Sequence, residues 1–203
     1  MQGEQAAEPK EPSLDPRDRL IQIVETQGLL RDLPEPIQLA SGEFSRDFID
    51  GKRALADGVD LKLACQVITE ELAERSIDFD VVGGLTMGAD QFSHALAVLA
   101  GRRWIVVRKQ TKGRGTNKRI EGADVREGTR VLLVDDVVTT GGSIREAYEV
   151  IRETGAEIVA AVTLVDRGDV ASQFFSQLQV PYIPLVTYRD LGIQPVGRGR
   201  ISA

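Results

Sequence analysis

Apolar residues recur along the chain with two alternating periods. From about residue 57 onward, stretches with helical spacing alternate with short, continuous apolar runs. Helices are expected near 57–75, 90–100 and 170–178, and also after residue 143, where Thr154-Gly155 marks the end. Strands are expected at 79–82, 104–107, 130–134, 158–165 and 182–186. Helices of this length between strands predict an α/β fold with a central, mostly parallel sheet flanked by helices on both faces.

The N-terminal quarter follows a different pattern. Residues 1–13 are rich in Glu, Pro, Gln and Ala without an apolar period, which predicts a disordered tail. Asp15 before Pro16 favours the start of a helix, which Gly28 can end. Apolar residues on both sides of Ser41-Gly42 predict a short hairpin. The expected divisions are a tail (1–13), an N-terminal helix and hairpin segment (14–56), a core (57–190) and a C-terminal tail (191–203).

Composition narrows the class of protein. A chain of 203 residues is long enough for one α/β domain with a full apolar core. The single cysteine, Cys65, lies in a helical apolar pattern, so a disulfide framework and a thiolate metal site are excluded. No window approaches about 18 apolar residues, and residues 1–12 do not resemble an export signal. A cytoplasmic protein without membrane contact is expected.

Positive charge is concentrated in one stretch. The net charge is −6, yet the stretch from Arg102 to Arg119 carries eight basic residues and no acidic one. This distribution indicates a focused anionic ligand rather than a surface that coats nucleic acid. A solvated charge run and a nucleic-acid patch remain alternatives, although the glycine-containing part of the stretch offers no aromatic ring for base stacking.

The most informative segment runs from Val131 to Ser143. Its first four residues, Val-Leu-Leu-Val, are typical of a strand buried on both faces, so Asp135 and Asp136 are expected at the end of that strand. The following Thr139-Thr-Gly-Gly-Ser143 supplies hydroxyls and glycines at a helix start, which favours a phosphate cradle. Carboxylates beside a phosphate suit ribose hydroxyls, or Mg²⁺ held through its waters.

Three other interpretations of this segment are weaker. An ordinary strand-to-helix turn explains Gly141-Gly142 but not the carboxylates and hydroxyls together. A nucleotide triphosphatase needs an upstream G-x-x-x-x-G-K-[ST] string, which the chain lacks. A dinucleotide fingerprint starting at Gly113 fails because Lys118 occupies the position of its third glycine.

The segment resembles the phosphoribosyl-diphosphate binding motif of the type I phosphoribosyltransferases. In that family the acidic pair holds the ribose hydroxyls and the Thr/Gly turn holds the 5-phosphate. The resemblance implies the type I phosphoribosyltransferase fold, in which a small N-terminal hood segment covers the base. It also implies that phosphoribosyl diphosphate is bound by the following residues: Asp135, Asp136, Val137, Val138, Thr139, Thr140, Gly141, Gly142 and Ser143.

Further matches resemble the orotate phosphoribosyltransferases. Residues 108–122 are similar to their catalytic loop. This similarity implies that the diphosphate is contacted by Arg108, Lys109, Lys112 and Arg114. The catalytic residues that the resemblance implies are Lys112, Arg114 and Asp136. Asp166-Arg167-Gly168 resembles the segment whose arginine pairs with the orotate carboxylate. Residues 45–52 resemble the hood, with Phe48 stacking on the base beside Thr139. Residues 83–90 are similar to the loop that approaches the diphosphate. From position alone, Arg167 could instead form a surface ion pair, and Phe48 could be a core residue.

Two positions depart from the family pattern. Arg114 stands where the loop usually has a histidine, and Ala40 stands where a lysine commonly precedes the Ser-Gly pair. The only histidine, His94, lies within a helical pattern and is expected on the helix surface. A loop histidine is thus not available as acid or base, and one diphosphate contact is missing.

The expected function is orotate phosphoribosyltransferase, which makes orotidine 5-phosphate and diphosphate in pyrimidine biosynthesis. The resemblance implies Mg²⁺ as cofactor without a direct protein ligand, and a homodimer that exchanges its catalytic loops between active sites. The alternatives are a phosphoribosyltransferase for another base, a noncatalytic sensor of phosphoribosyl diphosphate, and a nucleic-acid-binding regulator of the same fold.

Overall fold

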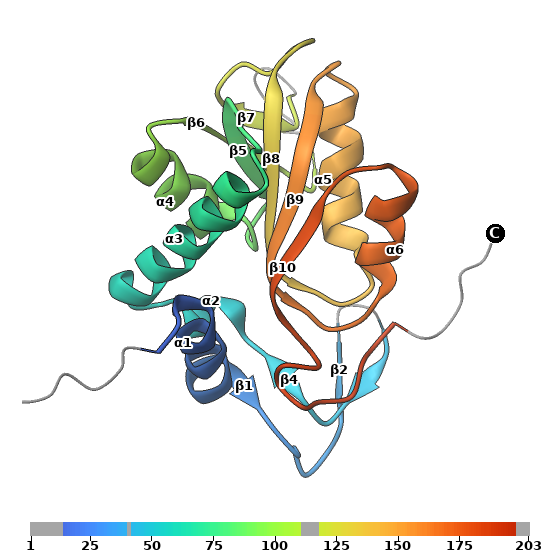
Figure 1. Cartoon of the computed structure of the whole chain (residues 1–203). Helices are drawn as coiled ribbons and strands as arrows, with labels where there is room; N and C mark the ends of the chain where they lie inside the picture. Colours follow the sequence, from blue (N-terminus) through green and yellow to red (C-terminus); the bar gives the residue numbers. More distant parts are fainter. Residues whose placement is uncertain (1–13, 40–41, 111–117, 198–203) are drawn as a thin grey trace, which may run out of the picture.

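A six-stranded sheet forms the centre of the molecule (Figure 1). The computed structural model describes residues 14–39, 42–110 and 118–197. The strand order is β10-β9-β8-β5-β6-β7, and every neighbouring pair is parallel except β6 and β7. The strands are β5 (Val81–Leu85), β6 (Arg103–Val107), β7 (Ile120–Gly122), β8 (Arg130–Val138), β9 (Glu157–Asp166) and β10 (Tyr182–Thr187).

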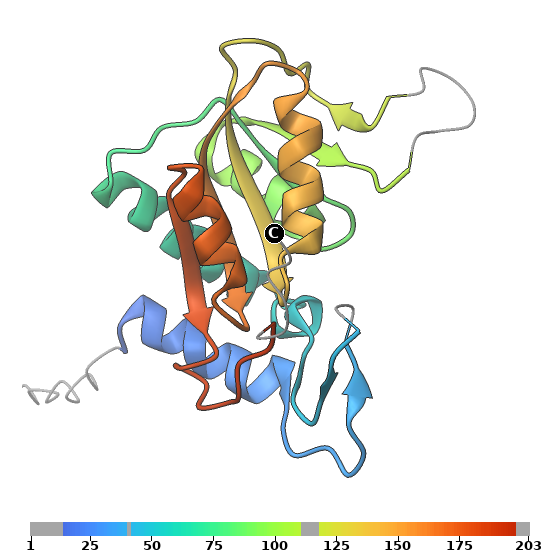
Figure 2. The ribbon, with the colours of Figure 1, turned by 90° about the vertical axis from the view of Figure 1, so that its right-hand side faces the viewer.

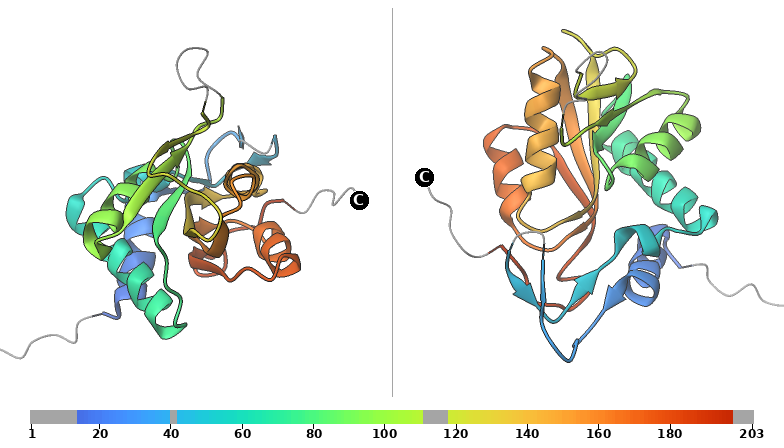
Figure 3. Two further views of the ribbon diagram at one scale, coloured as in Figure 1. Left: turned by 90° about the horizontal axis from the view of Figure 1, so that it is seen from above. Right: turned by 180° about the vertical axis from the view of Figure 1, so that it is seen from behind.

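Helices cover both faces of this sheet, as the sequence pattern predicted (Figures 2 and 3). The helices α3 (Gly58–Glu74) and α4 (Asp90–Ala100) pack on one face, while α5 (Gly142–Arg152) and α6 (Val170–Gln177) pack on the other. Buried residues form two apolar clusters, one on each face. The free thiol of Cys65 is buried in the first cluster, as its helical spacing indicated.

Strand β8 contributes to both clusters. Leu132 and Val134 belong to the cluster under α3 and α4, whereas Val131 and Leu133 belong to the cluster under α5 and α6. Successive side chains of a strand point to opposite faces, so a strand buried on both faces must be apolar at every position. This explains the continuous apolar run that marked the segment in the sequence.

Two strands extend further than their apolar runs predicted. Strand β5 continues to Leu85, so Gly83 and Gly84 lie within the sheet rather than in the following loop. Strand β8 continues to Val138 and pairs with β9 as far as Asp166, so the two carboxylates are part of the strand. Polar residues end an apolar run without ending backbone pairing, and glycine allows close strand contact. The sequence also gave no signal for the short edge strand β7.

The N-terminal segment lies below the carboxyl ends of β8, β9 and β10 (Figure 1). Helix α1 (Pro16–Ile23) begins after Asp15, whose side chain accepts a hydrogen bond from the Arg17 amide, and one π-helical turn, η1 (Val24–Gly28), extends it. Two small antiparallel pairs follow, and the helix α2 (Gly51–Ala54) was not predicted. The pairs join β1 (Leu29–Leu30) to β4 (Phe48–Ile49), and β2 (Ile37–Gln38) to β3 (Phe44–Ser45). We call residues 29–54 the hood.

Residues 191–197 pack back onto the body. Leu191, Ile193 and Val196 are buried, and the Val196 amide donates a hydrogen bond to the carbonyl of Arg167. Within the described residues, no helix is long and apolar enough to cross a membrane.

We expect the glycine at the centre of β5 to be essential for stability. A Cβ atom at Gly83 would lie 2.3 Å from the carbonyl oxygen of Ile105, which belongs to the neighbouring strand. Gly83→Ala should lower the free energy of unfolding by about 3 kcal/mol, the upper end of the overpacking range, because backbone cannot give way as a side chain can. Gly58→Ala is the control, since a Cβ there meets nothing within 4 Å. Equal urea midpoints for the two variants would refute this explanation.

Candidate active site

Two buried carboxylates define the carboxyl end of β8. Asp135 and Asp136 are only 4% and 7% exposed. Asp135 Oδ1 accepts a hydrogen bond of 3.0 Å from the amide of Asp136, and Asp136 Oδ1 accepts one of 2.7 Å from the amide of Val137. The strand therefore fixes both side chains, which lie at the edge of the sheet where ligands of open α/β proteins bind.

Two glycines let neighbouring backbone approach these carboxylates. A Cβ at Gly88, in the turn between β5 and α4, would lie 2.4 Å from Asp135 Oδ1 and 2.6 Å from Asp136 Oδ1. A Cβ at Gly51, at the start of α2, would lie 3.1 Å from the Cβ of Asp136. The turn after β5 and the hood thus both contact the carboxylate pair, in a space that a side chain would fill.

Lys52 supplies a positive charge that the sequence pattern did not reveal. Its Nζ lies 2.7 Å from Asp136 Oδ2. Burial by itself would lower the pKa of Lys52, but the hydrogen bond to Asp136 and the charges of Asp136, Asp50 and Asp135 outweigh burial and raise it. The sequence feature that could have indicated the position of Lys52 is Asp50. Its side chain caps α2 by accepting a hydrogen bond from the Arg53 amide, and so fixes the start of the turn that carries Lys52.

Asp135 is held in its protonated form over much of the physiological range. Burial, and then the nearby charge of Asp136, raise the pKa of Asp135 to about 8, although the Asp136 amide and the charges of Lys52 and Lys109 oppose the change. The charge of Lys109 therefore acts on Asp135.

The turn after β8 has the geometry of a phosphate cradle. Thr139 and Thr140 are half-buried, Gly141 has a φ of +77°, and α5 begins at Gly142 without a side-chain cap. The left-handed backbone at Gly141 is accessible to glycine at little cost. Amide groups at the start of a helix attract anions, so the threonine hydroxyls, the Ser143 hydroxyl and these amides form one anion-binding surface.

A pocket of about 260 Å³ joins the carboxylates to the hood. Arg167 is 1% exposed, and its Nη1 and Nη2 donate hydrogen bonds to the backbone oxygen of Asp47 (2.7 Å) and to Ser45 Oγ (3.3 Å). Its Nε is buried without a hydrogen-bond partner among the described residues. A surface ion pair for Arg167 is therefore excluded. The following residues line the pocket: Leu39, Phe48, Ile49, Asp50, Gly51, Lys52, Asp136, Val137, Thr139 and Arg167.

The basic stretch is divided between several places. Arg102 pairs with Asp78, Arg108 Nη1 lies 3.5 Å from Glu121 Oε1, and Arg119 pairs with Glu146. Among the described residues, Arg102 therefore lies in a different ion pair from Arg119, whereas Arg119 donates hydrogen bonds to the carbonyls of Arg108 and Lys109. Arg108 and Lys109 line a hollow beside Thr86 at the carboxyl end of β6. The predicted catalytic residues Lys112 and Arg114 lie outside the described residues, as does Ala40.

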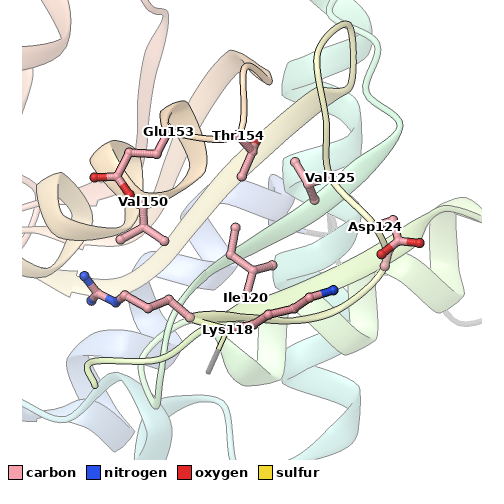
Figure 4. Close-up of a pocket in the computed structure, with 9 residues that line it drawn as sticks. Lys118, Ile120, Asp124, Val125, Val150, Glu153 and Thr154 are labelled. Carbon is pink, nitrogen blue, oxygen red and sulfur yellow. The ribbon is translucent and has the colours of Figure 1, made fainter. Parts of the chain in front are cut away.

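A second hollow, of about 400 Å³, lies between β7 and α5 (Figure 4). Lys118, Ile120, Asp124 and Val125 line one side of it, and Glu153 and Thr154 line the other. No residue predicted to bind substrate is among the described residues that line it. The pocket that Asp136 and Arg167 line is therefore the better candidate for the active site.

Comparison with known proteins agrees with this geometry. A family model described as the phosphoribosyl transferase domain matches residues 54–173. An orotate phosphoribosyltransferase of Pyrococcus furiosus is 40% identical over 153 residues, which are 75% of this chain and 84% of that protein. One of Streptomyces avermitilis is 40% identical over 185 residues, which cover 88% of this chain and 98% of that relative. The chain belongs to the orotate phosphoribosyltransferase family.

Solved structures of this orotate phosphoribosyltransferase family share the fold. The enzyme of Mycobacterium tuberculosis in complex with Fe(III) dicitrate has a TM-score of 0.74 and 32% identity, covering 88% of this chain and 100% of that one. The same enzyme in complex with 5-phospho-α-D-ribosyl 1-diphosphate has a TM-score of 0.71 and 31% identity, with the same coverage. The type I phosphoribosyltransferase fold predicted from the sequence is confirmed, and the chain is an enzyme of the glycosyltransferase type.

The raised pKa of Asp135 predicts a pH-dependent stability. An aspartate in the unfolded chain has a pKa of about 3.9, so between pH 4 and 8 the folded state binds more protons than the unfolded state. The free energy of unfolding should therefore fall as the pH rises, by up to about 1.4 kcal/mol per pH unit for one proton. Asp166, whose pKa burial raises to about 6, adds a fall of the same sign below that pH.

Asp135→Asn should remove the fall between pH 7 and 8, because Asp166, with a pKa of about 6, is almost fully ionised above pH 7. Urea unfolding at pH 5, 6, 7 and 8 measures the effect. The exposed carboxylate of Asp124 provides the control, and Asp124→Asn should leave the slope unchanged. A slope between pH 7 and 8 that persists in Asp135→Asn would contradict the assignment.

Proposed function

We propose that this protein transfers the 5-phosphoribosyl group of phosphoribosyl diphosphate to orotate, giving orotidine 5-phosphate and diphosphate. A bond forms between C1 of the ribose and a ring nitrogen of orotate, which loses its proton. The C1–O bond breaks, and its electron pair leaves with diphosphate. The observation that carries the proposal is the buried guanidinium of Arg167 in one pocket with Asp136 and Thr139.

Arg167 suits the carboxylate of orotate. Both of its hydrogen bonds go to uncharged oxygens, and within the described residues it forms no ion pair. A buried cation without an anionic partner is costly, and an arginine–carboxylate pair is strong and directional. Adenine and hypoxanthine carry no carboxylate, so this cation favours orotate over those bases. Phe48, on the hood side of the pocket, would stack on the base.

The ribose 5-phosphate would occupy the turn after β8. Thr139, Thr140 and Ser143 offer hydroxyls, while the amides at Gly141 and Gly142 complement the charge of the 5-phosphate. Asp135 and Asp136 would hold the ribose hydroxyls, with Val137 and Val138 as the strand backbone that leads into the turn. These are roles in binding, which the arrangement of the strand end supports.

Cations around the carboxylates would neutralise the departing diphosphate. Lys52 pairs with Asp136, the charge of Lys109 acts on Asp135, and Arg108 lines the same hollow as Lys109. The loop residues Lys112 and Arg114 would complete the group. Preorganised positive charge is a large contribution to catalysis where negative charge develops. Lys52 offers a cation in place of the lysine that Ala40 replaces.

The carboxylate pair also fits Mg²⁺ that enters with the substrate. Within the described residues, no group of three or more His, Cys, Asp or Glu side chains gathers. Asp135 and Asp136 offer carboxylate oxygens, the ligand type that Mg²⁺ prefers either directly or through its waters. Asp135 and Asp136 would hold its waters, and the ion would neutralise part of the diphosphate charge. We also propose a cytoplasmic location, consistent with the buried free thiol.

The proposal is tested by incubating the purified protein with phosphoribosyl diphosphate, Mg²⁺ and orotate, uracil, adenine or hypoxanthine, and measuring diphosphate. Release with orotate alone is expected. Turnover is expected to be slower than in relatives with a loop histidine, since a general acid contributes about 10² to 10⁴ in rate. Release only with a purine would exclude orotate. Binding of phosphoribosyl diphosphate without release would favour a sensor, and salt-sensitive binding of nucleic acid without turnover would favour a regulator.

Arg167→Lys separates recognition of the base from the other steps in the same assay. Lysine keeps the charge but loses the planar pair of donors, so kcat/KM for orotate should fall by about 10² while the KM for phosphoribosyl diphosphate changes little. Arg75→Lys at the end of α3, far from the pocket, is the matched control. Equal losses in the two variants would exclude base recognition by Arg167.

We further propose a homodimer in which α4 contacts a second copy. Val98, Leu99 and Trp104 are 86%, 42% and 39% exposed. Val98 and Leu99 line an apolar groove between α3 and α4. His94 lies on the surface of α4 and packs its ring edge against Trp104, with 4.5 Å between centroids. A contiguous exposed apolar surface of this kind is typical of a protein interface.

Val98→Glu should convert the dimer to a monomer, because a charge at the centre of an apolar interface is strongly unfavourable. Sedimentation equilibrium measures the change in mass. Leu30→Glu, at an exposed apolar position of the hood, is the control and should stay dimeric. A wild-type protein that sediments as a monomer would refute the dimer, and activity of the Val98→Glu monomer equal to wild type would refute loop exchange.

A further inference from the structure

The C-terminal segment 191–197, which we call the strap, packs against the turns that carry Arg167 and Thr139. It leaves the end of β10, where the Ile193 amide donates to the Tyr188 carbonyl, and ends beside the hood. Arg31 anchors its start by donating to the Leu191 carbonyl at 2.7 Å. Three buried apolar side chains, Leu191, Ile193 and Val196, fix its path. The strap is therefore packed against the protein rather than a free end.

The end of the strap contacts the two turns that form the pocket. The Val196 amide donates to the Arg167 carbonyl at 2.8 Å. A Cβ at Gly168 would lie 2.3 Å from the Val196 carbonyl oxygen, and a Cβ at Gly197 would lie 3.3 Å from the Thr139 carbonyl oxygen. The strap thus braces both the turn that carries Arg167 and the turn proposed to bind phosphate.

At the end of the strap, the hood makes contact through the side chain of Glu43. Glu43 Oε2 accepts a hydrogen bond of 2.7 Å from the Gly197 amide. Two residues further, Ser45 Oγ accepts from Arg167 Nη2. Glu43 directly precedes β3 and Ser45 ends it, so side chains two positions apart in the hood hairpin contact the strap and Arg167.

These contacts close a ring around the proposed base site. It runs from the Arg167 guanidinium to Ser45, along the hairpin to Glu43, across to Gly197, and through Val196 to the Arg167 carbonyl. We propose that Glu43 and Gly197 are positioning residues for the base: the Glu43–Gly197 hydrogen bond holds the hood hairpin over Arg167. The inference rests on the proposed function and identifies how that site is kept in shape.

The test measures kcat and both KM values for Glu43→Ala, Glu43→Gln and the control Glu35→Ala. Glu35 is an exposed carboxylate of the same hood. Removing a charge-assisted hydrogen bond should raise the KM for orotate about tenfold in Glu43→Ala, while the KM for phosphoribosyl diphosphate changes less than about threefold. Glu43→Gln should give an intermediate value, because its amide oxygen can still accept from Gly197. Orotate KM values equal to the Glu35→Ala control, or equal increases in both KM values, would overturn the inference.

A pair of glycines provides an independent test. Gly197 and Gly192 have φ values of +83° and +62°, so alanine strains the backbone at both. Only at Gly197 would the new Cβ meet neighbours, Val170 Cγ2 at 3.0 Å and the Thr139 carbonyl oxygen, whereas at Gly192 nothing lies within 4 Å. Gly197→Ala should raise the orotate KM more than Gly192→Ala does. Equal orotate KM values for Gly197→Ala and Gly192→Ala would contradict the positioning role of Gly197.

Hydrogen exchange separates failure of this inference from failure of the proposed function. If the wild-type protein releases no diphosphate with orotate, the proposed function fails. The exchange rates of the amides of residues 42–49 still measure whether the strap holds the hood hairpin. Glu43→Ala should exchange these amides at least about fivefold faster than wild type, since the hairpin loses its contact with the strap. Unchanged exchange relative to Glu35→Ala would overturn the inference whatever the activity.

Discussion

The active site depends on keeping two carboxylates side by side at the buried end of a parallel strand. Asp135 and Asp136 sit where β8 still pairs with β9, so the sheet fixes their backbone, and Gly88 and Gly51 bring two further segments against them. Such a pair is unfavourable unless charge or protons compensate it. Lys52 compensates Asp136 directly, while burial and the charge of Asp136 keep Asp135 protonated in the folded protein below a pH of about 8.

The same end of the sheet presents a buried cation and helix-start amides that can bind anions. Arg167 is buried with hydrogen bonds to neutral oxygens, and the cradle after β8 presents uncapped amides at the start of α5. Both features are costly in isolation and are satisfied by an anion. A substrate pair that brings a carboxylate to Arg167 and a phosphate to the cradle matches each of these groups. This complementarity is the physical basis for assigning orotate and phosphoribosyl diphosphate to one pocket.

The hood and the strap hold the residues at the base end of the pocket in position. The hood is made of two-residue strand pairs, which are too short to be stable alone. Its position therefore depends on contacts with the body, among them Arg167 with Ser45 and Asp47, Lys52 with Asp136, and Glu43 with Gly197. Hood placement and the proposed recognition of the base thus share Arg167.

The sequence by itself determined the alternation of helices and strands, because apolar periodicity reflects which faces are buried. It also determined the Val131–Ser143 motif, because the residue types of that segment are unusual together. It could not determine where β5 and β8 end, since glycine and aspartate interrupt an apolar run without interrupting backbone pairing. It grouped Arg102 with Arg119, whereas the tertiary structure assigned them to separate ion pairs. The contacts of Lys52, Glu43 and Gly197 join residues 84 and 154 positions apart, and no local pattern encodes them. Only the folded chain brings these residues together, because its packing decides which distant segments meet at the end of β8.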